Sequence, residues 1–233
     1  MIYFERQSTF DLYKWAGHRI SANVEIGGMV VGVGDHLNTT VMKKQEKFYR
    51  SIIYVALVTV LILMVPLVAM QFTDEVKWNA PDFIVMGALI FSTGTGFILI
   101  TRSSPNTAYR IAAALTFMTA FLMVWANLAV GLIGSGPNLG NLIYMLVPAA
   151  AIFGTFLSNF NPSGMERTMY VTTLLLVVVT LVAFLANMDE YPSSSATDIL
   201  AVSGFFAMLF IVSGLIFRFA AQQGRRESEK SNG

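Results

Sequence analysis

Six long apolar runs dominate the pattern of hydrophobic and polar positions along the chain. They cover residues 51–70, 83–100, 108–134, 139–158, 169–186 and 199–217. A helix needs about 20 mostly apolar residues to cross the hydrocarbon of a bilayer, so each run predicts one transmembrane helix. The joints between them are short and rich in Gly, Pro, Asn and Ser, which makes consecutive helices antiparallel. The pattern therefore predicts an all-α fold, an integral membrane bundle of six transmembrane helices.

The positive charges predict the orientation of this bundle. With the N-terminus in the cytoplasm, 14 of the 15 Lys and Arg residues fall on the cytoplasmic side, and Lys77 alone falls outside. Cytoplasmic joints of membrane proteins carry an excess of Lys and Arg. We therefore expect an N-in/C-in protein.

Three segments follow from this assignment. Residues 1–41 form a short cytoplasmic N-terminal segment, 42–220 the six-helix transmembrane domain, and 221–233 a cytoplasmic polar tail. The Gly- and Val-rich patch at 25–34 is too short to span and is compatible with a small strand or hairpin. Met42 and two lysines precede the first span, as at the start of many bacterial membrane proteins. We therefore consider Met42 as an alternative translation start. In that case residues 1–41 are an over-extended start, a stretch that the sequence includes but that is not translated.

Composition narrows the chemistry further. The chain is 55% hydrophobic and 12% charged, about half the charge of an ordinary soluble domain, and it has no Cys. No Asp, Glu, Lys, Arg or His falls in the middle of a span, whereas proton relays and most ion-coupled transporters need such groups. We predict no catalytic residue, no metal ligand and no cofactor, and do not expect an enzyme. The net charge of +1 gives no bias toward nucleic acid.

Neutral polar residues around the third and fourth spans form the candidate intramembrane or turn site: Trp125, Asn127, Gly131, Asn141 and Tyr144. One interpretation is a small-solute or ion site lined by Asn side chains and freed carbonyls. The other is interhelical hydrogen bonding combined with a tight glycine turn. The sequence alone leaves both open and favours the structural one.

A ladder of small residues runs along the second span. Ala88, Ser92 and Gly96 recur every four residues, a spacing that lets helix backbones approach closely. We predict that they form a helix-packing face. Pro66 and Pro148 predict kinks in the first and fourth spans.

Several segments resemble a widespread group of uncharacterised bacterial polytopic membrane proteins. The stretches that carry the resemblance are VPLVAMQFTDEVKW at 65–78, WANLAVGLIGS at 125–135, NLIY at 141–144 and GFFA at 204–207. The resemblance covers about 42–220 and implies the same fold and a location in the bacterial cytoplasmic (inner) membrane. It implies no activity, because none is assigned to the group.

Two classes of function remain. The first is a structural or accessory membrane protein that interacts with lipids or with a partner. The alternative is a small transporter or channel for an uncharged or weakly charged solute, built from the Asn127 and Asn141 region. The partners that we predict are membrane lipids, together with a second copy of the chain or another membrane protein. A water-filled cavity reaching the bilayer midplane would separate the two classes.

Overall fold

The structure is a computed structural model that describes residues 24–26, 29–31, 33–73, 75–102, 104–134, 138–191 and 194–232. The chain divides into two compact units, Met1–Tyr54 and Val55–Gly233. In the first unit, β1 (Val24–Ile26) pairs with β2 (Met29–Val31) as an antiparallel hairpin, in which Val24 lies opposite Val31. This hairpin is compatible with the small strand or hairpin considered for the Gly- and Val-rich patch. Of the predicted N-terminal segment 1–41, residues 1–23, 27, 28 and 32 lie outside the described residues, and residues 33–41 form the start of α2 (Val33–Phe72).

The described residues contain six helical segments that are long and apolar enough to cross a membrane, which confirms the predicted fold class. Four are the single helices α2 (Val33–Phe72), α3 (Ala80–Thr101), α4 (Thr107–Ala129) and α7 (Pro162–Leu185). The fourth segment along the chain joins α5 (Leu139–Tyr144) to α6 (Leu146–Leu157). A 3₁₀ turn (Met188–Glu190) precedes the last helix, α8 (Ala196–Asn232).

Asparagine determines where four of these helices begin. Asn79, Asn106, Asn138 and Asn161 precede α3, α4, α5 and α7, and each side chain accepts a hydrogen bond from a backbone N–H of the first turn. The first N–H groups of a helix have no partner inside it, so a side-chain oxygen at this position stabilises the start. At α3 the bonding is reciprocal, because the Asp82 carboxylate accepts a hydrogen bond from the Asn79 backbone N–H at 2.8 Å.

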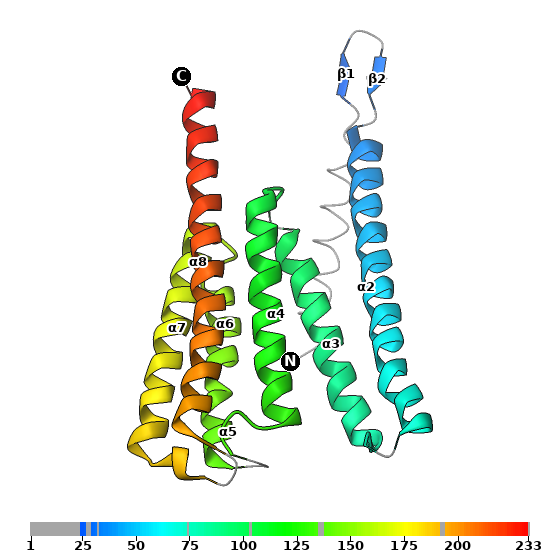
Figure 1. Cartoon of the computed structure of the whole chain (residues 1–233). Coiled ribbons are helices and arrows are strands. Elements are labelled where there is room, and N and C mark those ends of the chain that lie inside the picture. The colour runs from blue at the N-terminus through cyan, green and yellow to red at the C-terminus, as the bar shows by residue number, and fades with distance from the viewer. Residues whose placement is uncertain are drawn as a thin grey trace, which may run out of the picture. The chain divides into compact units, whose positions relative to one another are not determined.

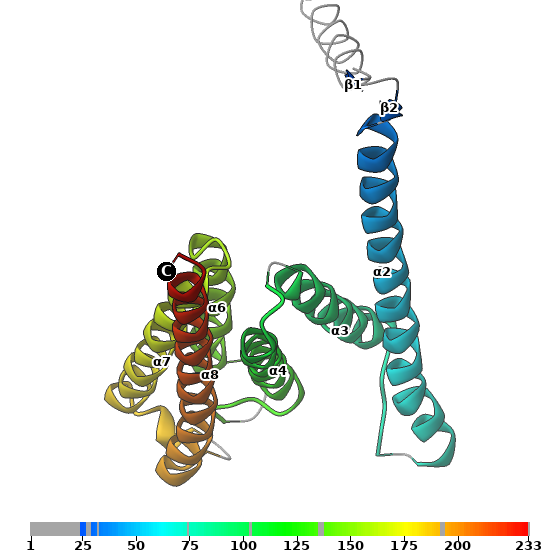
Figure 2. The same cartoon turned by 90° about the horizontal axis from the view of Figure 1, so that it is seen from above.

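Helix α8 is at the centre of the helical packing in the second unit. It lies along α7 and also packs against α4, while α6 lies against α7 and α3 against α4 (Figures 1 and 2). The core between them is made of large apolar side chains with less than 2% exposure, among them Met123, Met169, Leu176, Phe210 and Phe217. Many apolar side chains on the outer faces stay exposed, as expected where the surrounding solvent is lipid.

Several spans differ from their predicted bounds or form, and α7, for example, begins at Pro162 rather than at residue 169. The third was expected to reach residue 134, but α4 ends at Ala129 because Gly131 adopts a left-handed φ of 86° that no helix contains. The fourth is broken after Tyr144, because Pro148 has no N–H to donate to the Tyr144 carbonyl. This break agrees with the kink expected at Pro148, whereas α2 continues through Pro66.

The predicted polar tail is part of the last helix. Helix α8 has 37 residues, which at 1.5 Å each give about 55 Å. The hydrocarbon is only about 30 Å thick. Most of residues 221–232 therefore extend α8 beyond the apolar layer.

The end of the bundle where α4 begins is held by polar contacts. The Tyr109 hydroxyl donates to the Phe160 carbonyl at 2.8 Å, and its ring packs edge-on against Phe217. The Asn106 amide donates to the Gln223 side chain of α8 at 3.0 Å. These contacts join the start of α4 to α8 and to the turn between α6 and α7.

Close packing of α7 on α8 predicts different costs for two glycines of α8. A Cβ at Gly214 would lie 2.8 Å from Tyr170 Cε1 and 3.3 Å from Met169 Cβ, whereas a Cβ at Gly204 would meet nothing within 4 Å. We expect Gly214→Val to lower the free energy of unfolding by about 1–3 kcal/mol through overpacking. The matched variant Gly204→Val should stay within about 0.5 kcal/mol of the wild type. Unfolding by sodium dodecyl sulfate in micelles measures both; equal values would contradict the α7–α8 packing.

Candidate functional site

The two asparagines of the candidate polar site meet in one turn. The Asn127 amide donates to the Asn141 carbonyl at 2.7 Å. The Asn141 side-chain oxygen accepts from the N–H groups of Leu132 and Ile133, at 2.8 and 2.9 Å. Asn138 completes the turn, because its amide donates to the Ile133 carbonyl at 2.6 Å while its oxygen accepts from the Asn141 N–H at 2.9 Å.

Gly131 is required at its place in this turn. Its φ of 86° is unfavourable for any residue that has a Cβ. A Cβ there would also lie 2.6 Å from the Gly134 carbonyl oxygen and 2.7 Å from the Asn141 amide nitrogen. Asn127, Gly131 and Asn141 therefore form one compact hydrogen-bonded turn between α4 and α5, in which their polar atoms bond backbone groups. The geometry agrees with the structural interpretation of these residues.

The other two residues of the candidate site lie elsewhere. Trp125 is 41% exposed on α4. Tyr144 is buried at the end of α5, where its hydroxyl bonds to Ser203 at 2.9 Å and to Thr180 at 3.1 Å; Thr180 in turn donates to Ser203 at 2.9 Å. This hydroxyl cluster joins α5, α7 and α8 and is separate from the Asn127 turn.

A pair of hydroxyls also joins α4 to α8, and the sequence did not predict it. The hydroxyl oxygens of Thr116 and Ser213 lie 2.6 Å apart, and each also lies 3.0 Å from the Ala112 carbonyl oxygen, so the two hydroxyls share this acceptor. Isolated Ser and Thr residues are common in apolar helices and usually bond their own backbone, so nothing in the sequence singles these out. Their pairing depends on which helix faces are brought together.

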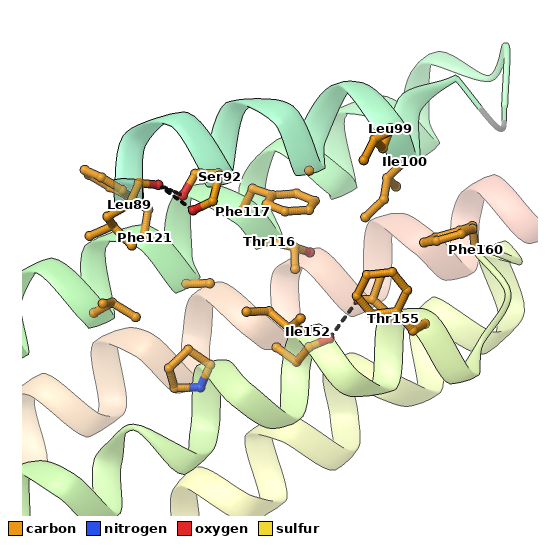
Figure 3. A pocket seen from close by; sticks show the side chains of 17 residues that line it. Leu89, Ser92, Leu99, Ile100, Thr116, Phe117, Phe121, Ile152, Thr155 and Phe160 are labelled. Carbon is orange, nitrogen blue, oxygen red and sulfur yellow. Dashed lines mark hydrogen bonds between the residues drawn. The ribbon is translucent and has the colours of Figure 1, made fainter. Parts of the chain in front are cut away.

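An apolar groove of about 270 Å³ lies between α3, α4 and α6 (Figure 3). In Figure 3, Leu89 and Phe121 lie toward one end, and Leu99, Ile100 and Phe160 toward the other. Its apolar lining comes from Leu89, Leu99, Ile100, Phe117, Ala120, Phe121, Val124, Pro148, Ala151, Ile152, Phe156 and Phe160.

Four hydroxyls also line the groove, and each has a bond to a carbonyl of its own helix. Ser92 and Thr93 donate to the Leu89 carbonyl at 3.1 and 2.7 Å. Thr155 donates to the Ala151 carbonyl at 2.8 Å, and Thr116 belongs to the pair described above. The groove therefore presents a surface that suits a hydrocarbon rather than a polar solute.

The small-residue ladder of α3 is divided among three environments. Gly96 lets the Phe117 ring of α4 lie against α3, since a Cβ there would be 2.7 Å from Phe117 Cε1. Ser92 is exposed in the groove, and Ala88 is exposed on the helix surface. Close approach to α2 uses Gly87 and Gly94 instead, where an added Cβ would lie 3.2 Å from Leu63 and 2.8 Å from Val55. The close contacts of α3 within the chain thus involve Gly87, Gly94 and Gly96, and the packing face expected from Ala88, Ser92 and Gly96 stays a prediction.

Comparison with known proteins identifies no relative of this chain. No family model matches the chain, and neither the curated proteins nor the solved structures yield a match. Among the described residues, no group of three or more His, Asp or Glu side chains is placed to hold a metal ion. The groove and the polar turn are thus assigned from geometry alone, and the resemblance to the bacterial group stays a prediction.

Alanine substitutions of the two asparagines distinguish a structural turn from a solute site. Asn141→Ala leaves two backbone N–H groups without an acceptor and should lower the free energy of unfolding by about 2–5 kcal/mol, since an unpaired buried group costs about 1–3 kcal/mol. Asn127→Ala removes one bond and should cost roughly half as much. Unfolding in micelles provides the comparison. If Asn127→Ala left stability unchanged, the structural assignment would be wrong and the solute site would regain support.

Proposed function

We propose that this integral membrane protein is an accessory protein that interacts with lipids, holding an apolar chain in the groove between α3, α4 and α6. The observation that carries the proposal is the chemistry of that groove: an almost wholly apolar lining, with every lining hydroxyl bonded to a carbonyl of its own helix. Such a surface offers dispersion contacts and no polar recognition.

The size of the groove supports a slender occupant. Sites for drug-sized molecules enclose about 300–1,000 Å³, and this groove has about 270 Å³. The lining runs along α3 from Leu89 to Ile100, which at 1.5 Å per residue is about 16 Å. This volume spread over that length suits a single acyl or isoprenoid chain. The chain would lie against Phe117 and Phe121 on one side and Ile152 on the other.

The use of polar atoms in the core also favours this class over the alternative transporter. Asn127 and Asn141 bond the turn between α4 and α5, and Tyr144, Thr180 and Ser203 bond one another. Polar groups already paired inside the bundle offer little to a passing solute.

The proposal also includes the membrane in which the protein lies and its orientation there. The excess of Lys and Arg on one side supports an orientation with both termini in the cytoplasm, and the resemblance of residues 42–220 to bacterial membrane proteins supports a bacterial cytoplasmic membrane. A second copy of the chain or another membrane protein is a further proposed partner, which native mass spectrometry tests directly.

The lack of cysteine makes thiol labelling a direct test for a water path. Single cysteines at Ser92, in the groove, and at Ser203, in the core, should both be protected from a membrane-impermeant thiol reagent. The exposed residue Ser228 near the end of α8 provides the control and should label fast as Ser228→Cys. Fast labelling of Ser203→Cys would indicate water at depth and would support the transporter instead.

A bulky side chain in the groove tests lipid binding itself. Ser92→Phe adds a ring to an exposed groove position, so we expect it to reduce the phospholipid retained by the purified protein. Val171→Phe is the matched control, because Val171 is 62% exposed on α7 and does not line the groove. Retained lipid is counted by native mass spectrometry after mild detergent extraction. Equal retention in the two variants would contradict a chain in the groove, and Ile152→Trp repeats the test if Ser92→Phe folds poorly.

A further inference from the structure

The charges beside the groove indicate the charge of the headgroup that its occupant has. Between Asp82 and Glu166 the chain contains Arg102 and Arg110 and no Asp, Glu or Lys. This stretch includes α4, α6 and all of α3 after its first turn, the helices that wall the groove. The walls therefore have a local positive charge with no acidic residue of their own to balance it.

Both arginines belong to the same end of these helices. Arg102 follows the last residue of α3, and Arg110 lies in the first turn of α4, across a joint of a few residues. The groove-lining residues Leu99 and Ile100 lie in the last turn of α3. One end of the groove thus approaches the arginine end of the bundle.

Arg110 lies on the groove face of α4. It precedes Phe117 by seven residues and Val124 by fourteen, which are about two and four helical turns. Its neighbour Tyr109 bonds the carbonyl of Phe160, the residue at that end of the groove in Figure 3. Helical side chains lean toward the helix N-terminus, so the Arg110 guanidinium leans from the groove toward the membrane surface.

Arg110 also has its guanidinium available. It is exposed and takes part in neither the Arg50–Glu46 nor the Arg218–Glu166 ion pair. Guanidinium groups bind phosphate oxygens through paired N–H donors. The geometry therefore points to an anionic phospholipid as the occupant: one acyl chain lies in the groove, and its phosphate headgroup contacts Arg110.

This inference rests on the proposed lipid binding and adds selectivity for a negative headgroup. One basic residue near a membrane surface strengthens binding of an anionic lipid by about fivefold. Arg110→Gln should therefore lower retention of phosphatidylglycerol about fivefold and leave retention of phosphatidylcholine with the same acyl chains unchanged. Arg167→Gln is the matched control, because Arg167 is an exposed arginine on α7 away from the groove.

The experiment uses the full chain in nanodiscs of equal phosphatidylglycerol and phosphatidylcholine content, with bound lipids counted by native mass spectrometry after release. A loss of phosphatidylglycerol preference in Arg110→Gln but not in Arg167→Gln supports the inference. An unchanged preference in Arg110→Gln overturns it, even where Ser92→Phe still reduces total lipid and the proposed function stands. If Ser92→Phe and Ile152→Trp also retain lipid normally, the groove binds no chain and both proposals fail.

Discussion

Polar groups inside a bilayer have no water to bond, and much of this structure follows from that constraint. Each backbone N–H and carbonyl that a helix leaves open must find a partner within the protein. The joint between α4 and α5 meets the requirement with one side chain, since the Asn141 oxygen accepts from both Leu132 and Ile133. The asparagines that start α3, α4, α5 and α7 meet it at helix ends. Asparagine side chains thus serve here mainly as hydrogen-bond partners for backbone groups that the helices leave unpaired.

The same constraint shapes the interior of the bundle. Several hydroxyls that face the core bond one another or a carbonyl, as in the Thr116–Ser213 pair and the cluster of Tyr144, Thr180 and Ser203. Among the described residues, the buried hydroxyls of Thr95 and Thr172 are exceptions that have no partner. Apolar burial cannot drive helix association where lipid is as apolar as the core, so close packing and such bonds hold the helices together. Gly214 contributes by letting Tyr170 and Met169 of α7 approach α8.

The groove arises where this packing is incomplete. Gly96 lets the Phe117 ring lie against α3, while Ser92, one turn earlier, stays open. The result is an apolar space bordered by three helices and approached by arginines at one end. Selectivity for an anionic lipid would then depend on one exposed guanidinium, while the energy of binding came from the hydrocarbon. Removing the charge and filling the space should consequently have separable effects.

The sequence by itself determined the six apolar spans and the helix class, because hydropathy is a property of neighbouring residues. It also indicated that Asn127, Gly131 and Asn141 belong near a tight turn, and that Pro148 interrupts its helix. It did not predict that α4 stops at Ala129, that Ala88, Ser92 and Gly96 meet different surroundings, or that Thr116 meets Ser213. Those features depend on the rotation and crossing of helices far apart in the chain. In a chain this uniformly apolar, the hydrophobic pattern barely distinguishes one helix face from another, so only tertiary packing decided them.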